Sequence, residues 1–129
     1  MKELIVRTHS RFELIDITGQ VQGAVTETAL KDGFCHVFVP HTTAALTINE
    51  NADPDVPVDI LKELDSIIPL DDGYRHIEGN SAAHIKASLI GSWELVMVEK
   101  GQLMLGTWQS IFFCEFDGPR TRKVWVKTI

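Results

Sequence analysis

Three of the five histidines stand where the sequence suits a functional site rather than a packed core. His41 lies between a proline and two threonines, and His76 and His84 lie at the two ends of a run rich in small and amide residues. Such contexts are typical of positions where the chain turns and presents a side chain. Imidazole is the commonest protein ligand of transition metals, and it titrates near neutral pH. One shared site and three separate structural histidines both fit this pattern.

If the three histidines converge, they form an open metal site of the catalytic zinc type, with water or substrate as the fourth ligand. The predicted metal ligands are therefore His41, His76 and His84, and the predicted ion is zinc or another divalent transition metal. Mg²⁺ is the alternative for a diphosphate substrate. His41 and His84 are also predicted to be catalytic, together with Glu50, which follows a predicted strand and has no evident structural role. Asp53 is instead predicted to cap a helix.

A second group of residues offers hydrogen-bond donors to an anion, through hydroxyl groups, a helix start, an amide side chain and a guanidinium group. The predicted substrate- or phosphate-binding residues are Thr42, Thr43, Asn80, Ser81, Gln109 and Arg120. The structural alternative for Arg120 is a solvated charge on a turn. Arg120, Arg122 and Lys123 form the single local basic cluster, which is the right size for one phosphorylated metabolite.

Length and composition favour one soluble domain spanning residues 1–129. The formal net charge of −6 argues against nucleic acid as a partner, because a duplex-binding protein needs a basic face. No run approaches the roughly 20 apolar residues of a membrane span, and the first residues lack the apolar core of a signal peptide. Cys35 and Cys114 lie in apolar runs and are interpreted as reduced thiols. We therefore expect a cytoplasmic protein without a membrane partner.

The elements that would position these residues are mostly strands. Alternating or continuous apolar runs predict strands over 4–6, 12–17, 34–39, 44–48, 93–99, 106–116 and 124–129. Three helices are predicted: one from Thr18 to a stop at Gly33, one after Asp53, and one that begins at Asn80 or Ser81 and ends near Gly91. Short turns between strands favour an α+β fold with about seven mostly antiparallel strands and two or three helices. Strand 44–48 is expected to pair with strand 34–39, which leaves His41 in the connection.

Five runs of the sequence carry a resemblance to a known family: PHTTAA at 40–45, NENAD at 49–53, EGNSAAH at 78–84, LGTWQ at 105–109 and DGPR at 117–120. In order and spacing they resemble the YjbQ family, which is described as a family of secondary thiamine-phosphate synthases. The resemblance covers essentially the whole chain. It implies a compact α+β subunit that assembles as a homotrimer, with a pocket near the histidines. It also implies a weak synthase activity that joins a pyrimidine diphosphate to a thiazole phosphate.

Three functions remain open on the sequence. The first is a synthase-like transferase acting on small phosphorylated molecules. The second is a transition-metal-dependent hydrolase or lyase acting on an unknown phosphorylated metabolite, and the third is a non-catalytic trimer that binds an anion.

The predicted trimer would place the C-terminal strands near the subunit contact. Phe112, Phe113, Trp125 and Val126 exceed what one face of a single sheet needs. The histidine pocket is expected to lie close to a subunit boundary, because Arg120 is far from His41 in the sequence and could reach it from a neighbouring subunit.

Overall fold

A computed structural model describes every residue from Met1 to Ile129. It contains three helices and eight strands, which confirms the predicted α+β class. In chain order the elements are β1 (Lys2–Arg7), β2 (Glu13–Asp16), α1 (Thr18–Thr28), β3 (Gly33–Phe38), β4 (Ala44–Glu50), α2 (Asp55–Ile67), α3 (Ser81–Ile90), β5 (Trp93–Glu99), β6 (Gln102–Leu103), β7 (Gln109–Glu115) and β8 (Thr121–Thr128). No helix is both long enough and apolar enough to span a bilayer.

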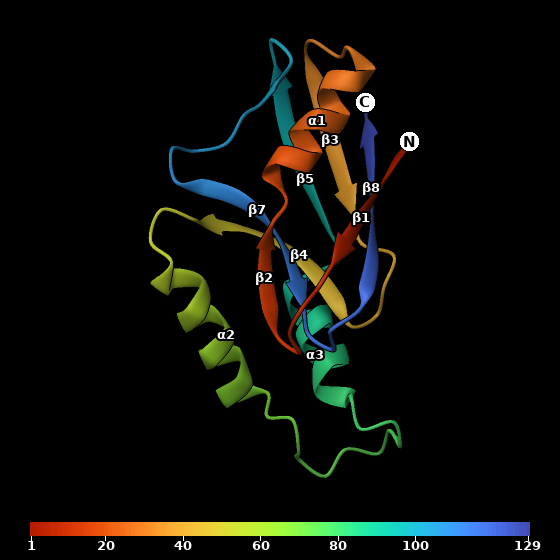
Figure 1. Ribbon diagram of the computed structural model, residues 1–129, viewed down its shortest axis with the longest axis vertical. Helices are drawn as coiled ribbons and strands as arrows, with labels where there is room; N and C mark the ends of the chain where they lie inside the picture. The colour runs from red at the N-terminus through yellow and green to blue at the C-terminus, as the bar shows by residue number, and fades with distance from the viewer.

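The strands form two antiparallel sheets (Figure 1). Sheet A has five strands in the order β1-β8-β3-β5-β6, and sheet B has three in the order β2-β7-β4. The predicted pairing of 34–39 with 44–48 is therefore wrong, because β3 lies between β8 and β5 while β4 pairs with β7. Pro40 lacks the N–H that would continue a ladder, and the chain crosses from sheet A to sheet B there.

The main core lies between the two sheets and is closed by α1. Alternation along the strands fills it: in β8, Val124 and Val126 point inward, and in β7, Phe113 is fully buried. Phe112 is buried as well, on the opposite face of β7 from Phe113. Phe113 and Val126 belong to the core between the sheets, and only Trp125 of the four is partly exposed, so these residues exceed one face of one sheet without needing a second subunit to cover them.

Among the predicted boundaries that differ from the structure, three concern α1 and β7. Helix α1 stops at Ala29, which adopts a left-handed φ of 57°, whereas Gly33 already belongs to β3. Thr18 does not cap α1 with its hydroxyl, which instead accepts the amide of Ile111 at 2.8 Å. The predicted strand 106–116 begins only at Gln109, and the short strand β6 precedes it.

The other two helices begin much as the sequence predicts. α2 begins at Asp55, and the Oδ1 atom of Asp53 accepts the Asp55 amide at 2.9 Å. Asp53 therefore accepts the first amide of the helix, as a capping side chain does, from a position outside the helix. α3 begins after Asn80 and ends at Gly91, where a φ of 102° favours glycine.

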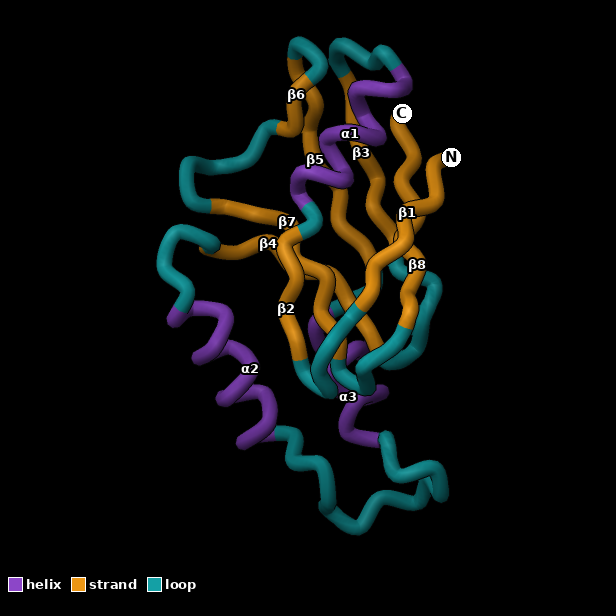
Figure 2. The backbone as a smooth tube through the Cα atoms, viewed as in Figure 1, coloured by secondary structure: helices purple, strands orange, loops and turns teal.

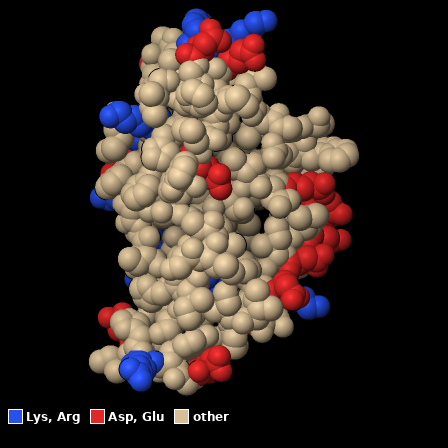
Figure 3. Space-filling view, turned by 180° about the vertical axis from the view of Figure 1, so that it is seen from behind, with Lys and Arg blue, Asp and Glu red and all other residues tan.

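Helix α2 stands on the outside of the molecule and is joined to α3 by a long connection, residues 68–80 (Figure 2). One attachment is Lys86 of α3, whose Nζ lies 3.5 Å from Asp65 and 3.9 Å from the centre of the Phe12 ring. Seen from behind, acidic side chains gather along the edge where α2 lies (Figure 3). Most of the connection is exposed, and it carries His76 and Glu78.

Candidate anion-binding site around His41

A polar cavity of about 370 Å³ lies where sheet A ends, at the crossing between β3 and β4. We call it the His41 pocket, and its walls come from that crossing, the start of α3 and the β7–β8 turn. It is lined by Pro40, His41, Thr42, Thr43, Glu78, Asn80, His84, Asp117, Arg120 and Arg122. Apart from Pro40, all of these residues carry polar or charged side chains. The chain thus brings together six predicted site residues: His41, Thr42, Thr43, Asn80, His84 and Arg120.

His41 is fixed by the backbone of the neighbouring strand. Strand β3 stops pairing with β8 at Phe38, opposite Trp125, and the next free amide of β8 is that of Lys123. This amide donates to Nε2 of His41 at 2.9 Å, so the imidazole accepts the hydrogen bond that a neighbouring strand would otherwise accept. Because Nε2 is an acceptor, the neutral ring carries its proton on Nδ1.

The surroundings of His41 also favour the neutral ring. Burial lowers the pKa of His41, and the positive charge of Arg122 lowers it further, although Glu115 acts in the opposite direction. At neutral pH the His41 pocket therefore holds an uncharged imidazole whose Nδ1–H is a donor.

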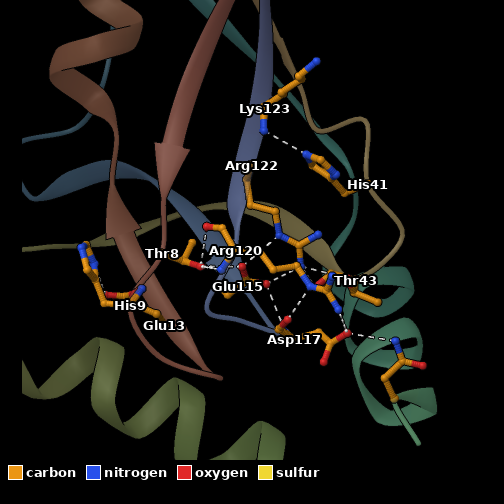
Figure 4. A network of polar contacts seen from close by, with 11 residues as sticks. Thr8, His9, Glu13, His41, Thr43, Glu115, Asp117, Arg120, Arg122 and Lys123 are labelled. Atoms are coloured by element: carbon orange, nitrogen blue, oxygen red, sulfur yellow. Dashed lines mark hydrogen bonds and ion pairs between the residues drawn. The ribbon is translucent and has the colours of Figure 1, made fainter. Parts of the chain in front are cut away.

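A buried ion pair forms the floor of the pocket (Figure 4). Glu115 is fully buried and Arg122 is 4% exposed. The Nε of Arg122 donates to Oε1 of Glu115 at 2.9 Å, and its Nη2 donates to Oε2 of the same carboxylate. The same Nη2 donates to the hydroxyl of Thr43 at 2.9 Å. The remaining nitrogen, Nη1, makes none of these bonds and is the donor that Arg122 can offer to the pocket.

Two further donors satisfy the Glu115 carboxylate. Thr8 donates its hydroxyl to Oε1 at 2.8 Å, and the amide of Asp117 donates to Oε2 at 3.1 Å. Burial alone would raise the pKa of Glu115, but the hydrogen bonds from Arg122 and Thr8 outweigh it, so the pKa is lowered. Glu115 therefore stays ionised and holds the guanidinium in one orientation.

Arg120 is held by the turn that carries it. Its Nη2 lies 2.9 Å from Oδ2 of Asp117, and its Nε donates to the Asp117 carbonyl at 2.8 Å. Asn80 donates to the same Oδ2 at 2.9 Å, while its own Oδ1 is buried without a partner. Arg120 and His41 line one pocket of one chain, so no neighbouring subunit is needed to bring Arg120 to His41. The β8 strand brings the two together.

The three-histidine metal site stays a prediction, and the chain alone does not gather the three rings into one cluster. His84 lies in the first turn of α3, and its ring centre is 5.3 Å from that of His76, with the rings nearly perpendicular. Nε2 of His41 is occupied by the Lys123 amide, and Nδ1 carries the proton, so this ring offers no lone pair to a metal. No group of three or more His, Cys, Asp or Glu side chains is arranged to hold a metal ion.

Two other predicted residues lie at the far end of sheet B. Glu50 is the last residue of β4 and pairs with Gln109, the first residue of β7. At about 3.3 Å per residue, Glu50 is roughly 20 Å along the strand from Ala44, which adjoins the His41 pocket. The side chain of Gln109 turns back to accept the amide of Gly106 at 2.7 Å. Ser81 lines a neighbouring cavity with His76 and His84.

The ion pair of Glu115 and Arg122 was not among the predicted site residues. The sequence does contain a signal for this pair. Arg122, Val124 and Val126 alternate along a strand and must share one of its faces. Glu115 likewise stands in an apolar run. Opposite charges on the inward faces of two apolar strands predict a buried pair.

The fold and the pocket define a small α+β domain with two antiparallel sheets and a polar site where the chain crosses from one sheet to the other. The family model described as "UPF0047 protein YjbQ-like" matches residues 2–129. The chain therefore belongs to the YjbQ/UPF0047 family, as its sequence motifs indicated.

Similar proteins come from bacteria and archaea. UPF0047 protein YugU of Bacillus subtilis is 51% identical over 128 residues, covering 98% of this chain and 97% of the relative. UPF0047 protein MJ1081 of Methanocaldococcus jannaschii is 51% identical over 124 residues, covering 96% and 90%.

The solved structures agree closely with this fold. An uncharacterised conserved protein of the family from Clostridium acetobutylicum is 56% identical and superposes with a TM-score of 0.98, with 100% of both chains covered. A protein of unknown function from Sulfolobus solfataricus is 37% identical, with a TM-score of 0.94 and coverage of 98% of this chain and 94% of that one.

Proposed function

We propose that the His41 pocket binds the phosphoryl group of a small phosphorylated metabolite. The observation that carries this proposal is the guanidinium of Arg122, whose Nε and Nη2 are held by Glu115 while Nη1 makes no bond within the chain. The Nδ1–H of His41 and the exposed Thr42 hydroxyl add two donors from the facing wall. Donors fixed before binding suit an anion, because no reorganisation is needed when it arrives.

Directed donors, and not net charge, are the basis of this proposal. Two arginines and two carboxylates line the pocket, so their formal charges cancel. Asp117 is engaged by Arg120 and Asn80, and Glu78 lies 3.7 Å from His76 on the exposed connection. Asp117 therefore has hydrogen-bond partners of its own, and the free donors on Arg122 and His41 remain available to a phosphate.

The candidate reaction is formation of thiamine phosphate, which rests on the family resemblance. The thiazole nitrogen would form a bond to the methylene carbon of the pyrimidine diphosphate as the carbon–oxygen bond breaks and pyrophosphate leaves. This step needs donors for the departing charge and no proton from the nucleophile. Nη1 of Arg122 and Nδ1–H of His41 would supply such donors, with His84 beside them. A hydrolase that holds its metal with three histidines is less well supported, because Nε2 of His41 is already occupied by the Lys123 amide.

Calorimetry with inorganic phosphate and pyrophosphate tests the binding proposal. The purified protein should bind both, and Arg122→Lys should weaken binding by about tenfold or more, because lysine cannot pair with Glu115 and also present a second directed donor. His9→Ala is the matched control, since His9 is exposed and lies outside the pocket. Equal affinities for wild type and Arg122→Lys would overturn the proposal.

An assay with the two thiamine precursors tests the reaction separately. Wild type should release pyrophosphate and form thiamine phosphate, and His41→Ala and His84→Ala should lose the activity. Unchanged turnover in both variants would assign the activity to another site or a contaminant.

We also propose that the chain assembles as a homotrimer through the outer face of sheet A. The β3–β5 register places Phe34 opposite Met97 and Phe38 opposite Trp93 on this face. Phe34, Trp93 and Met97 are each about half exposed, and together with Leu95 they make an apolar surface of the kind that marks a subunit contact. Residue 92, next to Trp93, lines a cavity that also contains His41. A neighbouring copy on this face would border the site.

A further inference from the structure

A second cavity shares a wall with the His41 pocket. It has a volume of about 330 Å³, and we call it the serine pocket. It is lined by His41, Thr42, Ala44, His84, Ala87, Ser88, Gly91 and Ser92. Three of these, His41, Thr42 and His84, also line the His41 pocket. The two cavities therefore adjoin each other along these three residues, which we call the partition. Its side chains are two imidazoles and a hydroxyl.

The two sides of the partition differ in chemistry. The His41 pocket contains two arginines and two carboxylates, whereas the serine pocket contains no Asp, Glu, Lys or Arg. Its polar groups beyond the partition are hydroxyls: Ser88 donates to the carbonyl of His84 at 2.9 Å, and the Ser92 hydroxyl makes no hydrogen bond within the chain. Ala44, Ala87 and Gly91 keep the rest of the wall small. Such a cavity suits an uncharged group that forms hydrogen bonds.

We propose that the two cavities bind the two halves of one ligand, a phosphate monoester of a small polyhydroxy compound. This rests on the proposed phosphate binding: the phosphoryl group occupies the His41 pocket, and the hydroxylated part occupies the serine pocket. The ester linkage then passes between His41 and His84. His41 lines both cavities, and the Lys123 amide fixes its ring, so its Nδ1–H is a donor available to the linking oxygen.

A third cavity gives the competing answer. It has a volume of about 400 Å³ and is lined by Tyr74, Arg75, His76, Ser81, His84 and Ile85. Its aromatic and aliphatic side chains would suit a planar, less polar group. It shares only His84 with the His41 pocket, against the three residues shared with the serine pocket. Because the serine pocket shares more residues with the His41 pocket, we favour the hydroxylated group. Binding of an aromatic group becomes an outcome of the test.

Calorimetry of the wild-type protein with three probes tests the proposal: inorganic phosphate, glycerol phosphate and phenyl phosphate. One or two added hydrogen bonds should make glycerol phosphate bind about three- to tenfold more tightly than inorganic phosphate, with phenyl phosphate showing no such gain. Ser92→Ala should remove part of the gain, and Ser88→Leu, which fills the cavity from an exposed helix position, should remove it. Both variants should bind inorganic phosphate as wild type does. Ser66→Ala on the exposed face of α2 is the matched control.

The outcomes separate this inference from the proposed function. Binding of inorganic phosphate without a gain for glycerol phosphate overturns the two-part ligand and leaves the phosphate site standing. Tighter binding of phenyl phosphate than of glycerol phosphate overturns it in favour of the third cavity, which is the result expected if the planar thiamine precursors are the ligands. A gain that survives Ser88→Leu overturns the assignment to the serine pocket. Failure to bind inorganic phosphate at all removes the proposed function and this inference together.

Discussion

Nε2 of His41 accepts the backbone amide of Lys123 at 2.9 Å, so a side chain takes the place of a strand at the end of sheet A. The bond joins residues 82 positions apart in the sequence. It fixes the tautomer of the ring and points the protonated Nδ1 away from Lys123. The same contact satisfies an amide at the edge of sheet A and orients the Nδ1–H donor of the site. One imidazole therefore serves both the fold and the site.

The first prediction concerns pH. Because burial lowers the pKa of His41, the unfolded chain takes up a proton on this residue at a higher pH than the folded chain does. The contribution of His41 to stability is therefore complete above about pH 6.5 and is lost as the pH falls below that value. Urea unfolding at pH 7.5 and pH 5.5 should show a smaller loss of stability for His41→Asn than for wild type. The same pH dependence in both proteins would contradict the prediction.

The second prediction concerns the buried ion pair. Glu115→Ala leaves Arg122 buried and unpaired, so it should lower the free energy of unfolding by about 3–5 kcal/mol. Glu115→Gln with Arg122→Met removes both charges and should recover part of the loss. Chemical denaturation measures these differences, with Glu63→Ala on the exposed side of α2 as the control. A loss under 1 kcal/mol for Glu115→Ala would show that the pair does not hold the pocket floor.

The third prediction concerns metal. Since Nε2 of His41 is occupied by the Lys123 amide, phosphate binding should be unchanged after treatment with a chelator, and His41→Ala should not alter the metal content of the untagged protein. Calorimetry and elemental analysis make the two measurements. Stoichiometric zinc that disappears in His41→Ala would instead support the three-histidine site.

The fourth prediction concerns assembly. Met97→Glu places a charge in the apolar face of sheet A and should convert a trimer into smaller species, measured by light scattering at micromolar concentration. Ile77→Glu is the control, because Ile77 is 99% exposed on the connection before α3. A monomeric wild-type protein, or a trimer that survives Met97→Glu, would each contradict the proposed contact.

Local signals in the sequence predicted local structure well. Gly91 after the helix of His84, and Asp53 before the helix that follows it, stand where the structure uses them. Turn chemistry and capping depend on a few adjacent residues, so they can be read from one sequence. His41, Thr43 and Arg120 could be named as candidate site residues for the same reason, because each lies beside a strand end, but their gathering within one chain was not predicted.

Relationships between distant elements were harder to predict. Pairing of the two strands on either side of His41 was the natural expectation, and nothing near Pro40 indicates that the chain changes sheets there. Glu50 was expected at the site because it follows a strand, but the strand runs away from the pocket and carries Glu50 with it. Strand direction relative to the site depends on partners elsewhere in the sequence. A period-two pattern cannot supply them.

The walls of the His41 pocket differ in how freely they can change. Its floor, with Arg122 and Glu115, belongs to the two sheets, where most substitutions disturb the core. Its rim at Glu78 belongs to the long connection between α2 and α3, most of whose side chains are exposed. Mutations in the rim can therefore accumulate at little cost to folding, while the anion-binding floor is retained. Divergence of ligand preference between descendants of this fold should consequently begin in residues 71–79, with the strands following only later.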